Sequence, residues 1–92
     1  MISIRESVQI VNQRGLHARA SAKFVNVVSE SFESLDIKIA KDGVEANGSS
    51  ILGLMMLGAA KGDTIEIIVS GDGSDEAMAE LAGLVRNGFG ED

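Results

Sequence analysis

Residues 35–48 have the sequence LDIKIAKDGVEANG, and this stretch decides the fold class. Apolar and polar residues alternate from Leu35 to Ile39, a pattern typical of a strand with one buried face. Asp42-Gly43 supplies the positive φ angles of a tight hairpin turn, so residues 44–48 are expected to return as the next strand. The stretch therefore predicts an antiparallel hairpin within a sheet.

Two further strands are predicted on either side of this hairpin. The first covers residues 2–11, where apolar residues stand at even positions between polar neighbours. The second is centred on Ile65, Ile67 and Val69, which alternate in the same way. Together with the hairpin they predict a sheet of four strands.

Two amphipathic helices are predicted from apolar residues spaced three and four apart. The first runs from about His17 to Ser31, with an apolar stripe of Ala18, Ala22, Val25 and Val28 expected to face the sheet. The last begins at Ser74, its predicted N-cap, and Gly88 can end it. The apolar face of that last helix consists of Ala77, Leu81, Leu84 and Val85.

A third, short helix is predicted between the third and fourth strands. Residues 50–57 are apolar on nearly every side, a pattern typical of a buried helix. Full burial is hard to arrange in so small a domain, so part of this helix is expected to face a partner. The alternative is that Met55 and Met56 fill the core.

The predicted order is β-α-β-β-α-β-α, which indicates an α+β fold. We expect an open-faced β-sandwich in which three helices cover one face of a four-stranded antiparallel sheet. The 92 residues allow one domain, spanning 1–92.

Charge and composition argue against several classes of function. Eight basic and fourteen acidic residues give a net charge of −6, and aromatic residues make up 3%, so nucleic-acid binding is not expected. No cysteine is present to form a disulfide or a thiolate site. Residues 1–6 do not resemble a signal peptide, and the apolar stretch 51–60 is far shorter than the about 20 residues that span a bilayer. A cytoplasmic location without membrane insertion is therefore expected.

His17 is the only histidine, and it stands where the first strand gives way to the first helix. A helix N-terminus offers unpaired N–H groups and partial positive charge, and Arg19 adds a cationic fork suited to phosphate oxygens. Such positive surroundings disfavour the imidazolium, so a neutral ring able to attack phosphorus is expected. This combination suits covalent capture of a phosphoryl group. The alternative is a purely structural histidine.

Other kinds of site are poorly supported by the residues. One histidine without cysteine cannot build the usual nitrogen or sulfur metal sets, so no metal is expected. A small hydrolase using His17 lacks the G-x-S-x-G elbow. Residues 53–58 resemble the opening of a P-loop, but Ala59-Ala60 follow where lysine and a hydroxyl residue are required.

Three stretches resemble one family. Residues 15–25, GLHARASAKFV, are similar to the active-site stretch of HPr, the histidine-containing phosphocarrier family of the phosphoenolpyruvate-dependent phosphotransferase system (PTS). Residues 50–55, SILGLM, resemble that family's regulatory-serine helix, and residues 57–62, LGAAKG, resemble the loop after it. The resemblance extends along the whole chain.

The resemblance implies a monomeric phosphocarrier without cofactor, and not an enzyme in its own right. His17 would accept a phosphoryl group on Nδ1 from phosphorylated enzyme I and pass it to an EIIA component of a sugar or nitrogen-type system. Arg19 would steady the phosphohistidine, and Gly15 would permit the turn that exposes the ring. Asn12 stands where the family often keeps a polar residue. Ala18, Ile51, Leu52 and Met55 would face partners.

Ser50 resembles the serine that an HPr kinase/phosphorylase modifies in many members of the family. A plain helix N-cap explains the same residue from its position alone. Both roles are compatible, because a phosphate at that place would also gain from the helix N-terminus while it repels acidic partners. Ser49 is the alternative cap or acceptor.

The sequence departs from the family pattern at two places. Ala20 follows the arginine where members commonly have proline, which removes some preorganisation of the helix start, yet the site is expected to survive. Asn26 and Ser29 stand at exposed helix positions where many members have lysine, and Lys23 is the nearest cation. Electrostatic steering toward acidic partners is therefore expected to be weaker.

A regulatory interaction module that is controlled through Ser50 and relays no phosphate is the alternative function.

Overall fold

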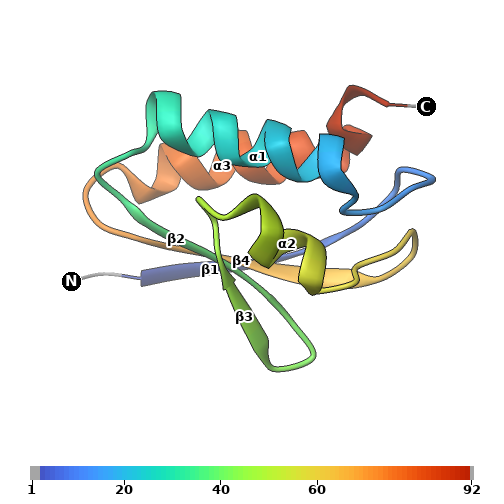
Figure 1. Cartoon of the computed structure of the whole chain (residues 1–92). Helices are drawn as coiled ribbons and strands as arrows, with labels where there is room; N and C mark the ends of the chain where they lie inside the picture. Colours follow the sequence, from blue (N-terminus) through green and yellow to red (C-terminus); the bar gives the residue numbers. More distant parts are fainter. Residues whose placement is uncertain (1–2, 92) are drawn as a thin grey trace.

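The computed structural model describes residues 3–91, and its elements follow the predicted order (Figure 1). The elements are β1 (Ser3–Gln9), α1 (Ala18–Ser31), β2 (Asp36–Lys41), β3 (Val44–Asn47), α2 (Ile51–Met56), β4 (Thr64–Ser70), α3 (Ser74–Arg86) and a 3₁₀ turn, η1 (Gly88–Gly90). Ile2 of the predicted first strand lies outside the described residues.

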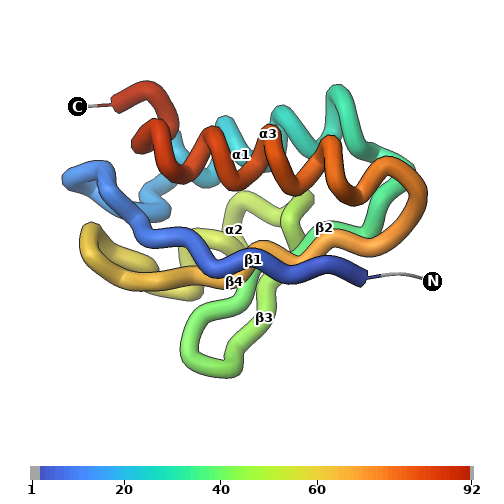
Figure 2. Tube along the Cα trace, turned by 180° about the vertical axis from the view of Figure 1, so that it is seen from behind, coloured from blue at the N-terminus to red at the C-terminus, as the bar shows by residue number. Residues whose placement is uncertain are grey.

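The four strands form one antiparallel sheet in the order β1-β4-β2-β3. The predicted hairpin joins β2 to β3, and Asp42 and Gly43 have φ angles of 51° and 83°, as the turn requires. The helices cover one face of the sheet, with α1 and α3 side by side in Figures 1 and 2. The predicted open-faced sandwich is confirmed.

The core lies between the inner face of the sheet and the helices. Its largest fully buried side chains come from all the layers: Phe24 of α1, Leu54 of α2, Leu81 of α3, Ile39, Ile65 and Ile67 of the strands, and Phe89 of η1. Each such side chain contributes about 1.5–3 kcal/mol by leaving water. Because η1 supplies a core residue, the segment that follows α3 is held against the domain.

The buried face of α1 differs from the predicted stripe. Ala20, Phe24 and Val28 are buried at spacings of four residues, whereas Ala18 is exposed. The predicted stripe omitted Phe24, the largest apolar side chain of the helix, and burial of that ring turns the helix toward it. Ala18 is thereby left on the outer surface.

The predicted N-cap of α3 is wrong. Gly73, with a φ of 86°, precedes the first helical residue, and Ser74 lies inside the helix. The Ser74 hydroxyl donates to the carbonyl oxygen of Gly71 instead of accepting from the helix N–H groups. The predicted end of the helix is confirmed, because Gly88 follows the C-cap Asn87 with a φ of 63°.

Within residues 3–91, every helix is too short or too polar to cross a membrane.

Candidate functional site

His17 is the N-cap residue of α1. Its backbone is extended, with φ −75° and ψ −177°, and its carbonyl oxygen accepts the first helical hydrogen bond, from Ser21 N at 2.9 Å. The side chain makes no capping hydrogen bond within the described chain, and 17% of it is exposed. The ring is therefore not used to cap the helix, and part of it reaches the surface.

Gly15 shapes the loop that leads to His17. Its φ is +62°, and its N–H donates to the Asn12 carbonyl oxygen at 3.2 Å. Leu16 N then donates to the carbonyl oxygen of Ala59 at 2.9 Å. This bond joins the histidine motif to the loop that follows α2, so two of the three stretches that resemble the family are in direct contact.

The loop after α2 is itself held in place. Asp63 Oδ2 accepts from Ala60 N at 2.9 Å, and the Asp63 carbonyl oxygen accepts from Ile10 N at 2.8 Å. Lys41 Nζ lies 3.7 Å from the same carboxylate. The carbonyl of Ala59 is therefore presented to Leu16 from a fixed turn.

A pocket of about 430 Å³ opens beside the His17 ring. It is lined by Gln13, Arg14, His17, Arg19, Lys23, Gly90 and Glu91. Arg14 and Arg19 are exposed and take part in none of the ion pairs formed within residues 3–91. Two permanently charged guanidinium groups beside an imidazole form a surface suited to a phosphoryl dianion. Arg19 was predicted here, and Arg14 was not.

Glu91 contacts the ring directly, which the sequence did not indicate. His17 Nε2 lies 2.8 Å from Glu91 Oε2 and 3.0 Å from Oε1. Burial raises the pKa of Glu91, but the hydrogen bonds from Asn12 and His17 and the charges of His17 and Lys23 outweigh it, so the pKa falls below its ordinary value. The positive surroundings expected for the ring therefore also include a carboxylate, which the sequence did not predict.

Asn12 connects this carboxylate to the loop. Its amide Nδ2 donates to Gly15 O at 2.9 Å and to Glu91 Oε1 at 3.1 Å, and the residue is 1% exposed. Its Oδ1 has no hydrogen-bond partner within residues 3–91. Asn12, the polar residue noted from the sequence, is thus buried and links the loop at Gly15 to the Glu91 carboxylate by hydrogen bonds.

Glu91 reaches the ring because η1 folds back over the start of α1. Phe89 is fully buried, and its carbonyl oxygen accepts from Lys23 Nζ at 2.6 Å. Figure 2 shows this end of the chain beside the loop that precedes α1. No periodic pattern marks a contact between residues 74 apart in sequence, so sequence reasoning had no signal for it.

Ala20, which replaces the usual proline, is fully buried as the third residue of α1. The helix still begins at Ala18, as alanine's high helix propensity allows. Asn26 and Ser29 are exposed, as expected.

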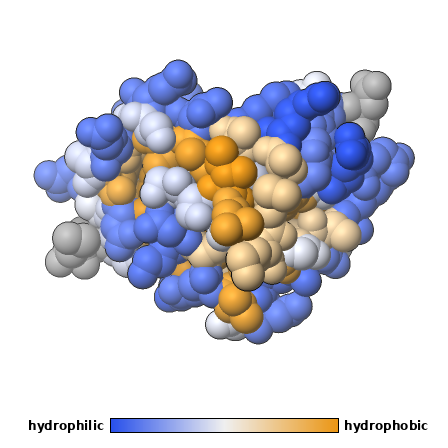
Figure 3. Space-filling view, viewed as in Figure 1, coloured by the Kyte–Doolittle hydropathy of each residue, from blue (hydrophilic) through white to orange (hydrophobic). Residues whose placement is uncertain are grey.

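A patch of exposed apolar residues covers α2. We call it the α2 patch, and it consists of Ile51, Leu52, Met55 and Met56. Leu52 and Met56 are 67% and 78% exposed, whereas Leu54 is the buried residue of the helix. Figure 3 shows apolar surface gathered over this part of the molecule. The alternative that Met55 and Met56 fill the core is wrong.

Ser50 is the N-cap of α2. Its Oγ accepts from Gly53 N at 2.9 Å, so the structural role predicted for it is confirmed. Ser49 makes a different contact, because its Oγ donates to Asn47 Oδ1 at 2.6 Å.

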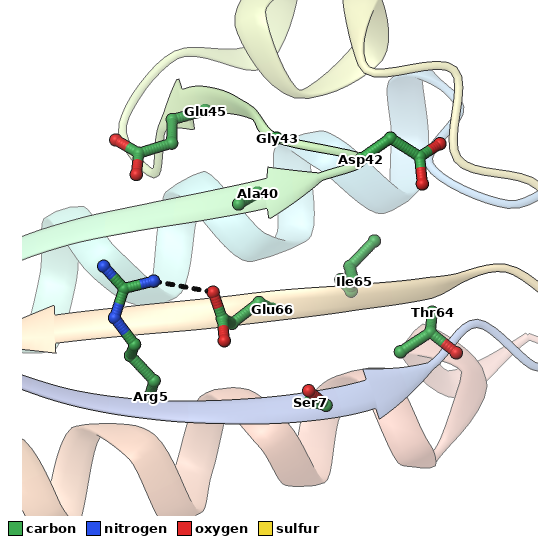
Figure 4. A pocket seen from close by; sticks show the side chains of 9 residues that line it. All are labelled: Arg5, Ser7, Ala40, Asp42, Gly43, Glu45, Thr64, Ile65 and Glu66. Atoms are coloured by element: carbon green, nitrogen blue, oxygen red, sulfur yellow. Dashed lines mark hydrogen bonds and ion pairs between the residues drawn. The ribbon is translucent and has the colours of Figure 1, made fainter.

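A second hollow, of about 270 Å³, lies on the open face of the sheet (Figure 4). An ion pair between Arg5 and Glu66, at 2.7 Å, crosses it, and the helices lie behind the strands in this view. It has no connection to the ring of His17. Within residues 3–91, no cluster of three or more potential metal ligands is found.

Comparison with known proteins gives one consistent result. Residues 4–87 match the family model described as the PTS HPr component phosphorylation site. A phosphocarrier protein HPr of Neisseria meningitidis is 46% identical over 88 residues, which cover 96% of this chain and 97% of that protein. The phosphocarrier protein NPr of Escherichia coli is 33% identical, over 99% of this chain and all of that protein. The crystal structure of an HPr from Thermoanaerobacter tengcongensis superposes with a TM-score of 0.86 at 36% identity, covering 100% of this chain and 99% of that one.

Proposed function

This chain belongs to the family of PTS HPr components, and from that premise we propose that His17 receives a phosphoryl group from phosphorylated enzyme I and passes it to an EIIA protein. The observation that carries the proposal is the pocket in which a single, partly exposed imidazole stands beside Arg14 and Arg19. The protein is then a stoichiometric carrier, which is phosphorylated and dephosphorylated once in each cycle.

In the first transfer, the lone pair of His17 Nδ1 forms a bond to phosphorus as the bond between phosphorus and the donor's nitrogen breaks. The electron pair of the broken bond stays on the donor. The second transfer reverses these roles, with the acceptor's nitrogen attacking the same phosphorus. Arg14 and Arg19 hold the phosphoryl oxygens in both steps, because charge on those oxygens persists throughout the transfer.

We propose that the α2 patch and Ala18 form the docking surface for donor and acceptor. Apolar residues at such exposure suggest a partner, and methionine adapts to differently shaped surfaces. One surface must serve both partners in turn, which favours contacts of this kind over fixed polar ones.

Ser50 is proposed as a regulatory phosphorylation site for an HPr kinase/phosphorylase. A phosphate on its Oγ would add about −1.5 to −2 charges at the start of α2, next to Ile51 and Leu52. That charge would have to lose water when an apolar partner docks, so docking of enzyme I should weaken.

The experiment is the intact mass of the protein after mixing with enzyme I, phosphoenolpyruvate and Mg²⁺. One phosphoryl increment that is removed by acid, resists base and is missing from folded His17→Ala supports the proposal. Acceptance that survives His17→Ala contradicts it. No increment on folded wild-type protein, together with altered partner binding in Ser50→Asp, would favour the regulatory module.

The type of EIIA served is decided by a second measurement. The phosphorylated protein is mixed separately with a sugar-type and a nitrogen-type EIIA, and loss of the phosphoryl increment is followed with time. The faster acceptor identifies the branch. The chain is similar to both an HPr and an NPr, so the sugar-type and the nitrogen-type EIIA are both candidate acceptors.

A further inference from the structure

Glu91 is the one carboxylate that contacts the reactive ring in the described chain, and nothing in the transfer chemistry above uses it. Both of its oxygens lie within hydrogen-bond distance of the same ring nitrogen, Nε2. A second side chain, the buried Asn12, donates to Oε1. The hydrogen bond from Asn12 therefore fixes the position of the carboxylate that contacts the ring.

An ionised carboxylate can only accept hydrogen bonds. The hydrogen in the contact with Glu91 must therefore belong to Nε2, in the neutral ring as well as in the charged one. A neutral imidazole carries one hydrogen on nitrogen, so the other nitrogen, Nδ1, bears the free lone pair. Within residues 3–91, Nδ1 forms no hydrogen bond that would occupy that lone pair.

We propose that Glu91 is a positioning residue that keeps the hydrogen of His17 on Nε2 and leaves Nδ1 free to attack phosphorus. The inference rests on the proposed function and names the group that selects the reactive nitrogen. Asn12 acts through Glu91, because its Nδ2 joins that carboxylate to the carbonyl oxygen of Gly15.

The same contact acts on the phosphorylated ring. When Nδ1 bonds to phosphorus, the Nε2 hydrogen stays in place and the ring acquires a positive charge. Glu91, 2.8 Å from Nε2, then faces that charge, while Arg14 and Arg19 face the phosphoryl oxygens. Each charge that develops during transfer thus has an opposite charge already oriented toward it.

Two substitutions separate the roles of the hydrogen bond and the charge. Glu91→Gln keeps an oxygen that can accept from Nε2 but removes the negative charge. Glu91→Ala removes both. Glu80→Gln, at an exposed position of α3, is the matched control for loss of one acidic residue.

The first readout is the tautomer of the neutral ring, measured by ¹⁵N NMR of His17 in the unphosphorylated protein. Wild type and Glu80→Gln should carry the hydrogen on Nε2. The share of the Nδ1–H form should rise about two- to tenfold in Glu91→Ala, as expected from loss of one net hydrogen bond, and little in Glu91→Gln. An Nδ1–H ring in wild type, or an unchanged tautomer in Glu91→Ala, overturns the proposal.

The second readout is the rate of phosphorylation by phosphoramidate, a small donor that needs no docking surface. Ammonia leaves as its P–N bond breaks and the bond to Nδ1 forms. Glu91→Gln should react about tenfold more slowly than wild type, because a charge-assisted contact becomes a neutral one. An unchanged rate in both Glu91 variants overturns the charge role.

The two proposals fail differently. If enzyme I does not phosphorylate wild type but the tautomer shifts in Glu91→Ala, the relay is wrong and the positioning role stands. If wild type is phosphorylated at His17 and neither Glu91 variant changes tautomer or rate, the relay stands and the positioning role is wrong.

Discussion

A Cβ atom added to Gly15 would lie 2.2 Å from the carbonyl oxygen of Ala59. The loop before His17 and the loop after α2 therefore touch backbone to backbone, and only glycine fits between them. Gly15 also has a φ of +62°, a conformation that other residues rarely adopt.

Gly15→Ala should destabilise the protein by about 3 kcal/mol or more, since the clash adds to the cost of a left-handed alanine of about 1–2 kcal/mol. Gly58→Ala is the control, because Gly58 has a φ of +65° and nothing within 4 Å of the added atom. Urea denaturation of both variants measures the difference. Equal losses would mean that the contact with Ala59 relaxes without cost.

Asn12→Ala should lower the free energy of unfolding by about 1–3 kcal/mol, because it leaves the buried carbonyl of Gly15 without its donor. Asn12→Asp should also destabilise, since it replaces a donor facing Glu91 with a second carboxylate. Chemical denaturation at neutral pH tests both changes. A neutral effect of Asn12→Ala would show that water replaces the amide.

The lowered pKa of Glu91 predicts a pH-dependent contribution to stability. The carboxylate is stabilised relative to the unfolded chain, so its contribution is present above its ordinary value of 4.5 and is lost as the pH falls through the lower folded-state pKa. The urea midpoints of wild type and Glu91→Gln should therefore differ at neutral pH and converge in acid. A difference that remains undiminished below that folded-state pKa would contradict this sign.

The pKa of Glu91 should also depend on its contact with His17. ¹³C NMR of the carboxyl group should give a higher pKa in His17→Ala than in wild type, because one hydrogen bond and one charge that lower it are removed. Glu80→Gln should leave the titration of Glu91 unchanged. The same midpoint in His17→Ala would mean that Asn12 and Lys23 alone lower the pKa.

Ser50→Ala should destabilise by about 1 kcal/mol, because Gly53 N loses its acceptor. Ser50→Asp retains a capping oxygen and should keep most of the stability, so any loss of enzyme I binding in that variant comes from its charge. Ser49→Ala is the control for removal of a neighbouring hydroxyl. A fully stable Ser50→Ala would mean that the cap is unimportant to α2.

Leu52→Ser should weaken binding to enzyme I by about tenfold or more without lowering stability, because the side chain is 67% exposed. Val44→Ser is the matched control, since Val44 is 61% exposed on the β2–β3 hairpin. Calorimetric titration compares the two affinities. Equal weakening would place the docking surface elsewhere.

Local patterns predicted most of the fold. The alternation of apolar and polar residues predicted the strands, and Asp42-Gly43 predicted the hairpin. Apolar residues spaced three and four positions apart predicted the two long helices. Each of these patterns depends only on neighbours in the sequence. The inward face of α1 was misassigned, because burial of Phe24 outweighs the spacing of small residues. The cap of α3 was misassigned because Gly73 adopts a left-handed conformation that frees Ser74 for another contact.

The candidate site, like the fold, contains residues that local motifs predicted and residues that only tertiary packing brings together. The residues that the sequence predicted for the site lie in short motifs: His17, Arg19, Gly15 and Ser50. Arg14 and Glu91 belong to no motif, and Glu91 meets the ring only because Phe89 is buried and Lys23 holds its carbonyl. Such contacts are set by tertiary packing, for which one sequence offers no local signal.

The anchoring of η1 by Phe89 also fixes when the site is completed during synthesis. His17 is synthesised 74 residues before Glu91. Until the late segment docks, His17 of a nascent chain has no contact with the Glu91 carboxylate. The complete arrangement around the ring therefore forms only after η1 has packed against the core.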